Sequence, residues 1–227
     1  MVRTFVVIGS NTAVGQAVVS LVTQKGGNVI SLDSQNADVN LDFSTAAGRL
    51  EAIEKVLEKK SFTIDAIIST ANIVANKPVA ISANFFGTTQ FIEGMYDELK
   101  RTTTPRVSIL NYFDFSLATS SELVEVILHS KEKKALKLAQ QILESAPDLA
   151  YKLYSSSQKA LWFWVQDVAK KRHWRRPGIL INAVTADSSA SAEEVAELLI
   201  WLASPINQTH TGEVFEARAL MQLSSAH

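Results

Sequence analysis

The sequence predicts an α/β fold with an open, doubly wound parallel sheet, and three observations lead to this fold class. Short apolar runs alternate with segments of helical periodicity along the chain. The composition, 47% hydrophobic and 20% charged residues, is typical of a protein with a sizeable core. No repeat, linker or low-complexity segment interrupts the pattern, so we expect a single domain over residues 1–227. Alternating strands and helices imply right-handed βαβ units.

The first half of the chain is expected to hold strands joined by long helices. The strands are expected at residues 4–9, 28–33, 64–70 and 106–113. The helices between them are expected at residues 12–26, 44–60 and 79–101. Gly26 and Gly27 should end the first helix, and Ser44 should be the N-cap of the second.

The second half begins with an inserted helical segment, expected at about 115–150. Thr119 and Glu122 would form its capping box. One face of this segment is apolar and consists of Val124, Ile127, Leu128, Leu138, Ala139 and Ile142. The remaining elements are expected to be a helix at 153–168, a strand at 178–184, a helix at 191–204 and a strand at 213–220.

Composition excludes several classes of function. The net charge of -1 offers no general attraction for nucleic acid or for an anionic membrane. There is no cysteine, and the histidines lie too far apart for a metal-ligand spacing, so no metal site is expected. No apolar run approaches the roughly 20 residues of a membrane span, and the run at residues 5–8 is too short for a signal peptide. We therefore expect a cytoplasmic protein.

The turn after the first strand has the composition of a nucleotide-binding turn. Gly9 and Gly15 bracket it, and Ala13 and Val14 lie between them. A dinucleotide site needs small residues here because the backbone turns sharply and approaches a pyrophosphate at a helix N-terminus. These residues are therefore candidates for cofactor binding.

Two aspartates support the nucleotide hypothesis by their position. Asp33 ends the second expected strand, where a carboxylate accepts both ribose hydroxyls and repels a 2′-phosphate, which favours NAD over NADP. Asp42 follows one short turn later and is a candidate adenine contact. The alternative is that Gly9 and Gly15 only allow a helix and a strand to pack closely, with Asp33 as an ordinary turn residue.

The helix that contains Tyr154 carries aromatic residues on several faces. Trp162, Phe163 and Trp164 are consecutive, so they cannot all point into one core. Exposed aromatic side chains are typical of an interface. We expect a homodimer or homotetramer that associates through the helix from Tyr154 to Val168; the alternative is a deeply buried helix.

Several positions together resemble the short-chain dehydrogenase/reductase family: Gly9, Ala13, Gly15, Asp33, Asn84 within NFFG, and Tyr154 within YSSSQKAL. The resemblance runs over essentially the whole chain. Residues 41–59 and the helical insertion are similar to the bacterial 3α-hydroxysteroid dehydrogenase/carbonyl reductase branch. The resemblance implies a Rossmann-type sheet of about seven strands, an NAD(P) cofactor that Ala71 also contacts, and redox chemistry on a hydroxyl or carbonyl group.

Members of this family use an asparagine, a serine, a tyrosine and a lysine together. By resemblance, Asn84 matches the asparagine that supports a proton-relay water, and Tyr154 matches the general acid/base. Asn111 stands at the serine position, where its amide would polarise a carbonyl oxygen. Gln158 stands at the lysine position, where it would hydrogen-bond the nicotinamide ribose.

Helical geometry keeps the nearest cation away from Tyr154. Residues four apart on an α-helix differ by about 40° in azimuth, whereas residues five apart differ by about 140°. Gln158 should therefore share the face of Tyr154, and Lys159 should point away from it. A neutral amide cannot lower a tyrosine pKa by charge attraction, and each pKa unit is worth about 1.4 kcal/mol.

Two further stretches depart from the family pattern. Residues 70–72 read Thr-Ala-Asn, where the family usually has Asn-Ala-Gly. Ala186 and Asp187 stand where it usually has Pro-Gly, and the next expected helix begins almost at once. We expect a lost substrate lid, which would leave the nicotinamide end open to water.

Three functions stay open from the sequence. The first is an NAD-dependent oxidoreductase that acts on a small-molecule hydroxyl or carbonyl substrate with impaired catalysis. The second is a non-redox pseudoenzyme or partner subunit of the same fold. The third is an isomerase or cyclase that uses Tyr154 without hydride transfer. An empty nucleotide site would end the first hypothesis.

Overall fold

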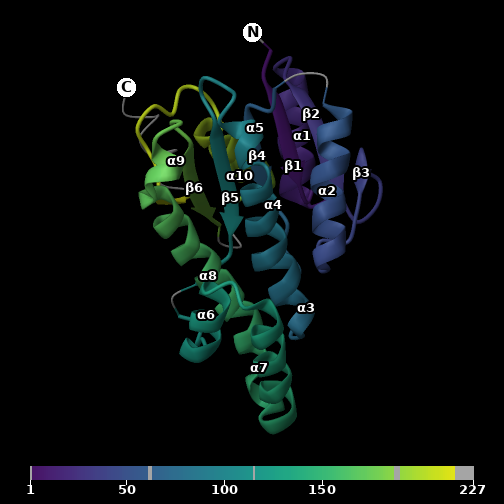
Figure 1. Ribbon diagram of the computed structural model, residues 1–227, viewed down its shortest axis with the longest axis vertical. Helices are drawn as coiled ribbons and strands as arrows, with labels where there is room; N and C mark the ends of the chain where they lie inside the picture. Colours follow the sequence, from purple (N-terminus) through teal and green to yellow (C-terminus); the bar gives the residue numbers. More distant parts are fainter. Residues whose placement is uncertain (1, 61–62, 115, 187–189, 218–227) are drawn as a thin grey trace.

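A parallel sheet of seven strands forms the centre of the computed structural model, which describes residues 2–60, 63–114, 116–186 and 190–217 (Figure 1). The strand order is β3-β2-β1-β4-β5-β6-β7, and every neighbouring pair is parallel. The strands are β1 (Thr4–Ile8), β2 (Asn28–Asp33), β3 (Val39–Asn40), β4 (Ala66–Ser69), β5 (Arg106–Asn111), β6 (Leu180–Thr185) and β7 (Val214–Glu216). The predicted fold class is confirmed.

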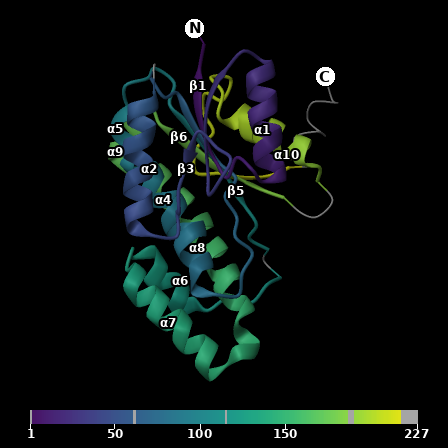
Figure 2. The ribbon, with the colours of Figure 1, turned by 90° about the vertical axis from the view of Figure 1, so that its right-hand side faces the viewer.

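Helices cover both faces of the sheet (Figure 2). On one face lie α1 (Ala13–Gln24) and α10 (Ala192–Leu202). On the other lie α2 (Ala46–Lys59), α4 (Thr88–Gly94) and α8 (Tyr151–Lys170). Shorter elements flank these: α3 (Pro78–Ile81), α5 (Tyr96–Leu99) and α9 (Arg172–Arg175). Right-handed crossovers between parallel strands require this two-sided arrangement.

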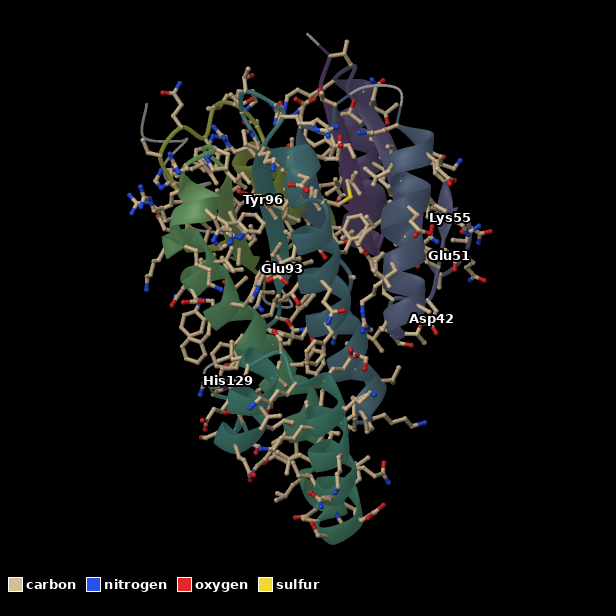
Figure 3. All side chains as sticks on the ribbon, in the orientation of Figure 1. Asp42, Glu51, Lys55, Glu93, Tyr96 and His129 are labelled. Carbon is tan, nitrogen blue, oxygen red and sulfur yellow. The ribbon has the colours of Figure 1, made fainter. Side chains whose placement is uncertain are left out.

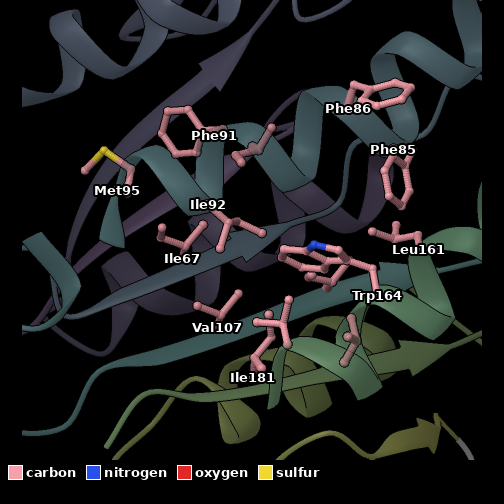
Figure 4. Packing of buried hydrophobic residues seen from close by; sticks show 14 of the residues in the cluster. Ile67, Phe85, Phe86, Phe91, Ile92, Met95, Val107, Leu161, Trp164 and Ile181 are labelled. Atoms are coloured by element: carbon pink, nitrogen blue, oxygen red, sulfur yellow. The ribbon is translucent and has the colours of Figure 1, made fainter. Parts of the chain in front are cut away.

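The central strands are buried along their whole length. Every residue of β1, β4 and β5 is buried, whereas burial alternates along β2, nearer the edge. This explains why the sequence shows continuous apolar runs rather than alternation at these strands. Figure 4 shows the packing on the α4 and α8 face, where Phe91, Ile92 and Trp164 lie against Ile67 and Val107 of the sheet.

The inserted helical segment lies beyond the carboxyl ends of the strands (Figures 1 and 2). It consists of α6 (Ser121–Leu128), α7 (Glu132–Ser145) and η2 (Pro147–Leu149). The sequence predicts one continuous helix over most of this stretch, but the chain breaks between α6 and α7, where Ser130 has a φ of 54°. Its apolar face is interrupted by this left-handed residue, and α6 and α7 still pack together.

Two predicted helix caps are wrong by one residue. Thr45, not Ser44, is the N-cap of α2 and accepts a hydrogen bond from Gly48 N. Ser120, not Thr119, is the N-cap of α6 and accepts from Leu123 N. In both cases two hydroxyl residues are adjacent, and either side chain suits a cap.

The predicted helix over residues 79–101 is not uniform. A π-helical turn, η1 (Ser82–Gly87), separates α3 from α4, and Asn84 lies within it. Such turns are rare and frequently occur at functional sites.

Strand β3 was not predicted because two residues are too few to show periodicity. The predicted last strand is confirmed only at β7, and residues 218–220 lie outside the described residues.

The aromatic residues of α8 face different environments. Trp164 is buried in the core beneath α4, whereas Phe163 is 37% exposed and stacks on Trp162. Self-association through this helix stays a prediction.

Among the helices of the described ranges, none combines the length and apolar character that a membrane span requires. The same ranges contain no cluster of His, Asp or Glu side chains suited to a metal ion.

The buried guanidinium of Arg49 joins α2 to the insertion. It is 1% exposed and donates to Gln90 Oε1 at 2.9 Å and to Phe43 O at 3.0 Å. It also forms an ion pair with Glu132 at the start of α7. Losing one member of a buried charge network leaves its partners desolvated and unpaired.

We predict that Arg49→Met lowers the free energy of unfolding by about 2–3 kcal/mol, because Glu132 and the Phe43 carbonyl lose their donor. The matched control is Lys55→Met on the same helix. Its exposed ion pair with Glu51 lies on the outer side of α2 (Figure 3) and should contribute less than about 0.5 kcal/mol. Urea denaturation measures both. Equal losses in the two variants would contradict a role for Arg49 in holding the insertion.

Candidate functional site

Two glycines bring the turn after β1 against the end of β4. Gly9 has a φ of 77°, and a Cβ on it would lie 2.6 Å from Ala71 N. A Cβ on Gly15 would lie 2.1 Å from Gly9 O. Any larger residue would force the two segments apart. The close packing that the sequence suggested as an alternative to nucleotide binding is therefore present, and the two are compatible.

The N-terminus of α1 offers free backbone donors at this turn. Thr12 is the N-cap and accepts from Gly15 N at 2.9 Å. The N–H groups of Ala13 and Val14 have no acceptor among the described residues. Ala13 has an exposed side chain and Val14 a buried one, so each would meet a ligand through its backbone. Free N–H groups at a helix N-terminus favour an anion such as a phosphate.

A cleft of about 170 Å³ opens beside this turn, at the carboxyl ends of β1, β2 and β4. The strand order reverses here, since β1 pairs with β2 on one side and with β4 on the other. Open α/β sheets bind ligands at such a switch point. The predicted residues that line the cleft are Gly9, Asp33, Asp42, Ala71 and Asn84; Thr12, Asn72 and Ile73 line it as well.

The two predicted aspartates are held in place by hydrogen bonds from the backbone. Asp33 accepts from Asn11 N at 2.8 Å and from Ser34 N at 2.7 Å, one bond on each carboxylate oxygen. Each oxygen keeps acceptor capacity for a ribose hydroxyl. Asp42 accepts from Ser44 N at 2.8 Å and lies at the start of α2 (Figure 3). Both carboxylates are thus oriented before any ligand binds.

Asn84 fixes the wall of the cleft from the π-helical turn. Its Oδ1 accepts from Ile73 N at 2.7 Å, and its Nδ2 donates to Ile73 O at 3.0 Å. The side chain is 1% exposed. Asn84 therefore holds the segment after β4 against η1. Its role in a proton relay stays a prediction.

Tyr154 and Gln158 meet at a residue that the sequence did not single out as a site residue. The Tyr154 hydroxyl donates to Asn72 Oδ1 at 3.0 Å. Gln158 Nε2 donates to the same oxygen at 3.2 Å. Gln158 Oε1 accepts from Tyr112 N at 3.1 Å, and the side chain of Gln158 is buried. An amide pair thus lies beside the phenol where the family places a cation.

Lys159 points to the other side of α8, as helical geometry predicts. Its Nζ donates to Thr119 Oγ1 at 3.3 Å and lies 5.8 Å from the centre of the Phe113 ring. Residue 158 lies on the side of Tyr154, and residue 159 contacts the segment between β5 and α6. The ammonium group therefore has its own contacts away from the phenol.

Asn111 is predicted to polarise a substrate, and this role stays a prediction. Asn111 is fully buried. Its Nδ2 donates to Gln158 O at 2.9 Å, and its Oδ1 accepts from Phe113 N at 2.9 Å. The side chain faces α8 rather than an open pocket, because it closes the turn after β5. In this structure Asn111 supports the helix that carries Tyr154.

Burial keeps the phenols of this site in the neutral form. Burial is the largest influence on the pKa of Tyr154 and raises it above its ordinary value; the hydrogen bond with Asn72 offsets part of this rise, and the neighbouring Tyr112 adds to it. Burial also raises the pKa of Tyr112. No charged group contributes to the shift of Tyr154 in the described part of the chain. The site is therefore suited to donate a proton and poorly suited to accept one at neutral pH.

Asn72 is a site residue that sequence reasoning missed, whereas Tyr112 was considered as a residue that lines a pocket or packs in the core. The departure from Asn-Ala-Gly at residues 70–72 was a signal for Asn72, but its partner is 82 residues away along the chain. Tyr112 follows the residue that was matched to the family serine. In the lid region, β6 ends at Thr185 and α10 begins at Ala192, and the predicted position Asp187 lies outside the described residues.

Comparison with known proteins gives one sequence relative and several solved structures. No protein-family model matches the chain. The 3-alpha-hydroxysteroid dehydrogenase/carbonyl reductase of Comamonas testosteroni is 28% identical over 184 residues, which cover 79% of this chain and 70% of that protein.

Two solved structures share the fold. The 3-alpha-hydroxysteroid dehydrogenase from Pseudomonas sp. B-0831, complexed with NADH, aligns with a TM-score of 0.85 at 23% identity and covers 99% of this chain and 100% of that one. A short chain dehydrogenase/reductase family oxidoreductase from Brucella ovis, with a partially ordered NAD, aligns with a TM-score of 0.69 at 16% identity and covers 95% and 99%. The sequence match and the shared fold together support the assignment of the chain to the short-chain dehydrogenase/reductase family.

Proposed function

We propose that the protein is an NAD-dependent oxidoreductase that acts on a hydroxyl or carbonyl group. One observation carries this proposal. Asn72 lines the nucleotide cleft and also accepts the hydrogen bond of the Tyr154 hydroxyl. The proton donor therefore lies one hydrogen bond from the cleft in which a nucleotide would bind.

The cleft suits NAD in its shape and in its polar groups. Gly9 and Gly15 let the turn after β1 pack closely against its neighbours, and the N–H groups at the start of α1 would be donors for a pyrophosphate. Asp33 presents a carboxylate for ribose hydroxyls and would repel a 2′-phosphate, which favours NAD over NADP. The relatives whose structures contain NADH or NAD share this fold.

The chemistry divides between the cofactor and the residues of this chain. NAD, when bound, supplies or accepts the hydride. Tyr154 donates its proton to the substrate oxygen, or takes the proton back when the reaction runs as an oxidation. Gln158 uses both ends of its amide on Tyr112 N and Asn72, so we assign it to orientation of the site rather than to the ribose.

The tests below also distinguish the oxidoreductase from the two alternatives, a non-redox descendant and an isomerase or cyclase. Among the described residues no cation lies beside the phenol, and Asn111 is buried; both observations favour a non-redox descendant, which would bind NAD weakly or without turnover. An isomerase or cyclase would depend on Tyr154 without consuming NADH. Only the oxidoreductase requires both Asp33 and Tyr154 for a hydride transfer that is followed by NADH absorbance.

We predict that Asp33→Ala weakens NAD binding at least about tenfold, because two hydroxyl-to-carboxylate hydrogen bonds are lost. The preference for NAD over NADP should fall in the same variant, since the 2′-phosphate meets no carboxylate. Calorimetry with both dinucleotides measures the change. The exposed Glu58 of α2 provides the control Glu58→Ala, which should bind like the wild type. Wild-type protein that binds neither dinucleotide would overturn the proposal.

We also predict that Tyr154→Phe reduces carbonyl reduction about 10²-fold or more and leaves NAD affinity unchanged, because only the proton donor is removed. NADH oxidation with a panel of aldehydes and ketones measures the rate. Tyr151→Phe, one turn earlier on α8 and 41% exposed, is the matched control and should keep wild-type activity. Equal rates for Tyr154→Phe and wild type would show that the phenol is not the acid.

A further inference from the structure

A chain of hydrogen bonds links the backbone N–H of Tyr112, directly after β5, to the Tyr154 hydroxyl through two amides. We propose that Asn72 and Gln158 are positioning residues that hold Tyr154 as a hydrogen-bond donor, so that the site works as a carbonyl reductase and is poor in alcohol oxidation near neutral pH. This inference rests on the proposed function for its substrate class. The orientation of Tyr154 that it requires is independent of any turnover.

The direction of the chain is set at Tyr112. A backbone N–H can only donate, so the Gln158 atom that lies 3.1 Å from Tyr112 N must be the oxygen. This fixes the amide of Gln158, because its nitrogen is then on the side of Asn72. The buried position of Gln158 leaves no solvent to satisfy the opposite orientation.

The orientation of Asn72 follows from that of Gln158. Gln158 Nε2 donates across 3.2 Å, so Asn72 presents its oxygen to it. The same oxygen lies 3.0 Å from the Tyr154 hydroxyl, which must then be the donor. If Asn72 turned its N–H₂ group toward the phenol, it would stabilise the phenolate, but its nitrogen would then face the nitrogen of Gln158. The network thus selects the protonated phenol.

The groups that face Tyr154 do not oppose this selection. From β5 the neighbouring titratable group is Tyr112, whose phenol is also neutral at physiological pH. From α8 the cation Lys159 is turned to Thr119 and Phe113. Burial raises the pKa of Tyr154. A hydrogen bond with Asn72 lowers the pKa of Tyr154 where the amide can donate to the phenolate, but here the amide oxygen accepts, so the bond exists only in the protonated form and favours that form.

Proton balance makes the two reaction directions respond differently to pH. In reduction, the carbonyl carbon gains the hydride that NADH supplies, the Tyr154 O–H bond breaks, and the substrate oxygen gains the proton. The phenolate that forms then regains a proton from water. Oxidation must begin with the phenolate, whose population falls about tenfold for each pH unit below the pKa of Tyr154. Reduction should be independent of pH through neutrality, whereas oxidation should rise with pH.

The first test measures the phenol in the free protein. Tyrosine ionisation is followed by absorbance in the wild type and in Tyr154→Phe, and the difference isolates Tyr154. We expect a midpoint above the ordinary value of about 10. Asn72→Ala should lower that midpoint by about one pH unit, because the acceptor of the phenol proton is lost and water enters. Asn28→Ala, an exposed asparagine on β2, is the control and should leave it unchanged.

A second variant distinguishes the orientation of Asn72. Asn72→Asp keeps an oxygen acceptor for both Tyr154 and Gln158, so it should fold normally and raise the midpoint further. Asn72 is only partly buried, which makes both substitutions tolerable. A midpoint that rises in Asn72→Ala, or falls in Asn72→Asp, would show that the amide nitrogen faces the phenol and would overturn the inference.

The last test compares the two reaction directions. For the wild type, kcat/KM for reduction should be flat from about pH 6 to pH 9, and kcat/KM for oxidation should rise about tenfold per pH unit. Asn72→Ala should shift the oxidation profile to lower pH. Parallel profiles in the two directions would refute the directional bias. If no substrate turns over, the proposed function fails, and the absorbance titration still decides the orientation of the phenol.

Discussion

The pitch of α8 decides which side chain faces Tyr154, and the chemistry of the site depends on that constraint. Four residues after the phenol the helix returns to the same face, and the residue there is Gln158. Its amide is uncharged and exerts no charge attraction on the phenol. It interacts with the phenol through Asn72, which accepts hydrogen bonds from both side chains. The cation one residue later, Lys159, contacts the segment between β5 and α6. Because the lysine is at position 159 and not at position 158, hydrogen bonds with amides, and not the charge of an ammonium group, act on the phenol.

The close approach of two backbone segments couples this site to the nucleotide cleft. Gly9 allows the turn after β1 to lie against Ala71, and Gly15 allows α1 to start directly beneath that turn. The segment after β4 consequently lines the cleft with one surface and presents Asn72 to the phenol with another. That one residue lines the cleft and also contacts the Tyr154 phenol is a direct result of packing at the switch point of the sheet.

Features that depend on local sequence pattern could be predicted from the sequence. Features that depend on contacts between distant residues could not. The strands could be predicted because burial on both faces of the sheet produces continuous apolar runs. That Gln158 lies on the same helix face as Tyr154 could be predicted from helical pitch alone. The caps at Thr45 and Ser120 were missed by one residue because adjacent hydroxyl residues compete for the same role. The orientation of Asn111 depends on a contact 47 residues away, which no periodicity reports.

The same network explains why a lysine at position 158 would not restore the family's usual site by itself. Gln158 accepts the hydrogen bond of Tyr112 N, and an ammonium group has no acceptor, so that part-buried N–H would lose its partner at a cost of about 1–3 kcal/mol. Burial would also lower the pKa of the new lysine and weaken its effect on the phenol. The amides at positions 72 and 158 therefore form one unit, and chemistry that depends on a cation requires changes at both ends of it.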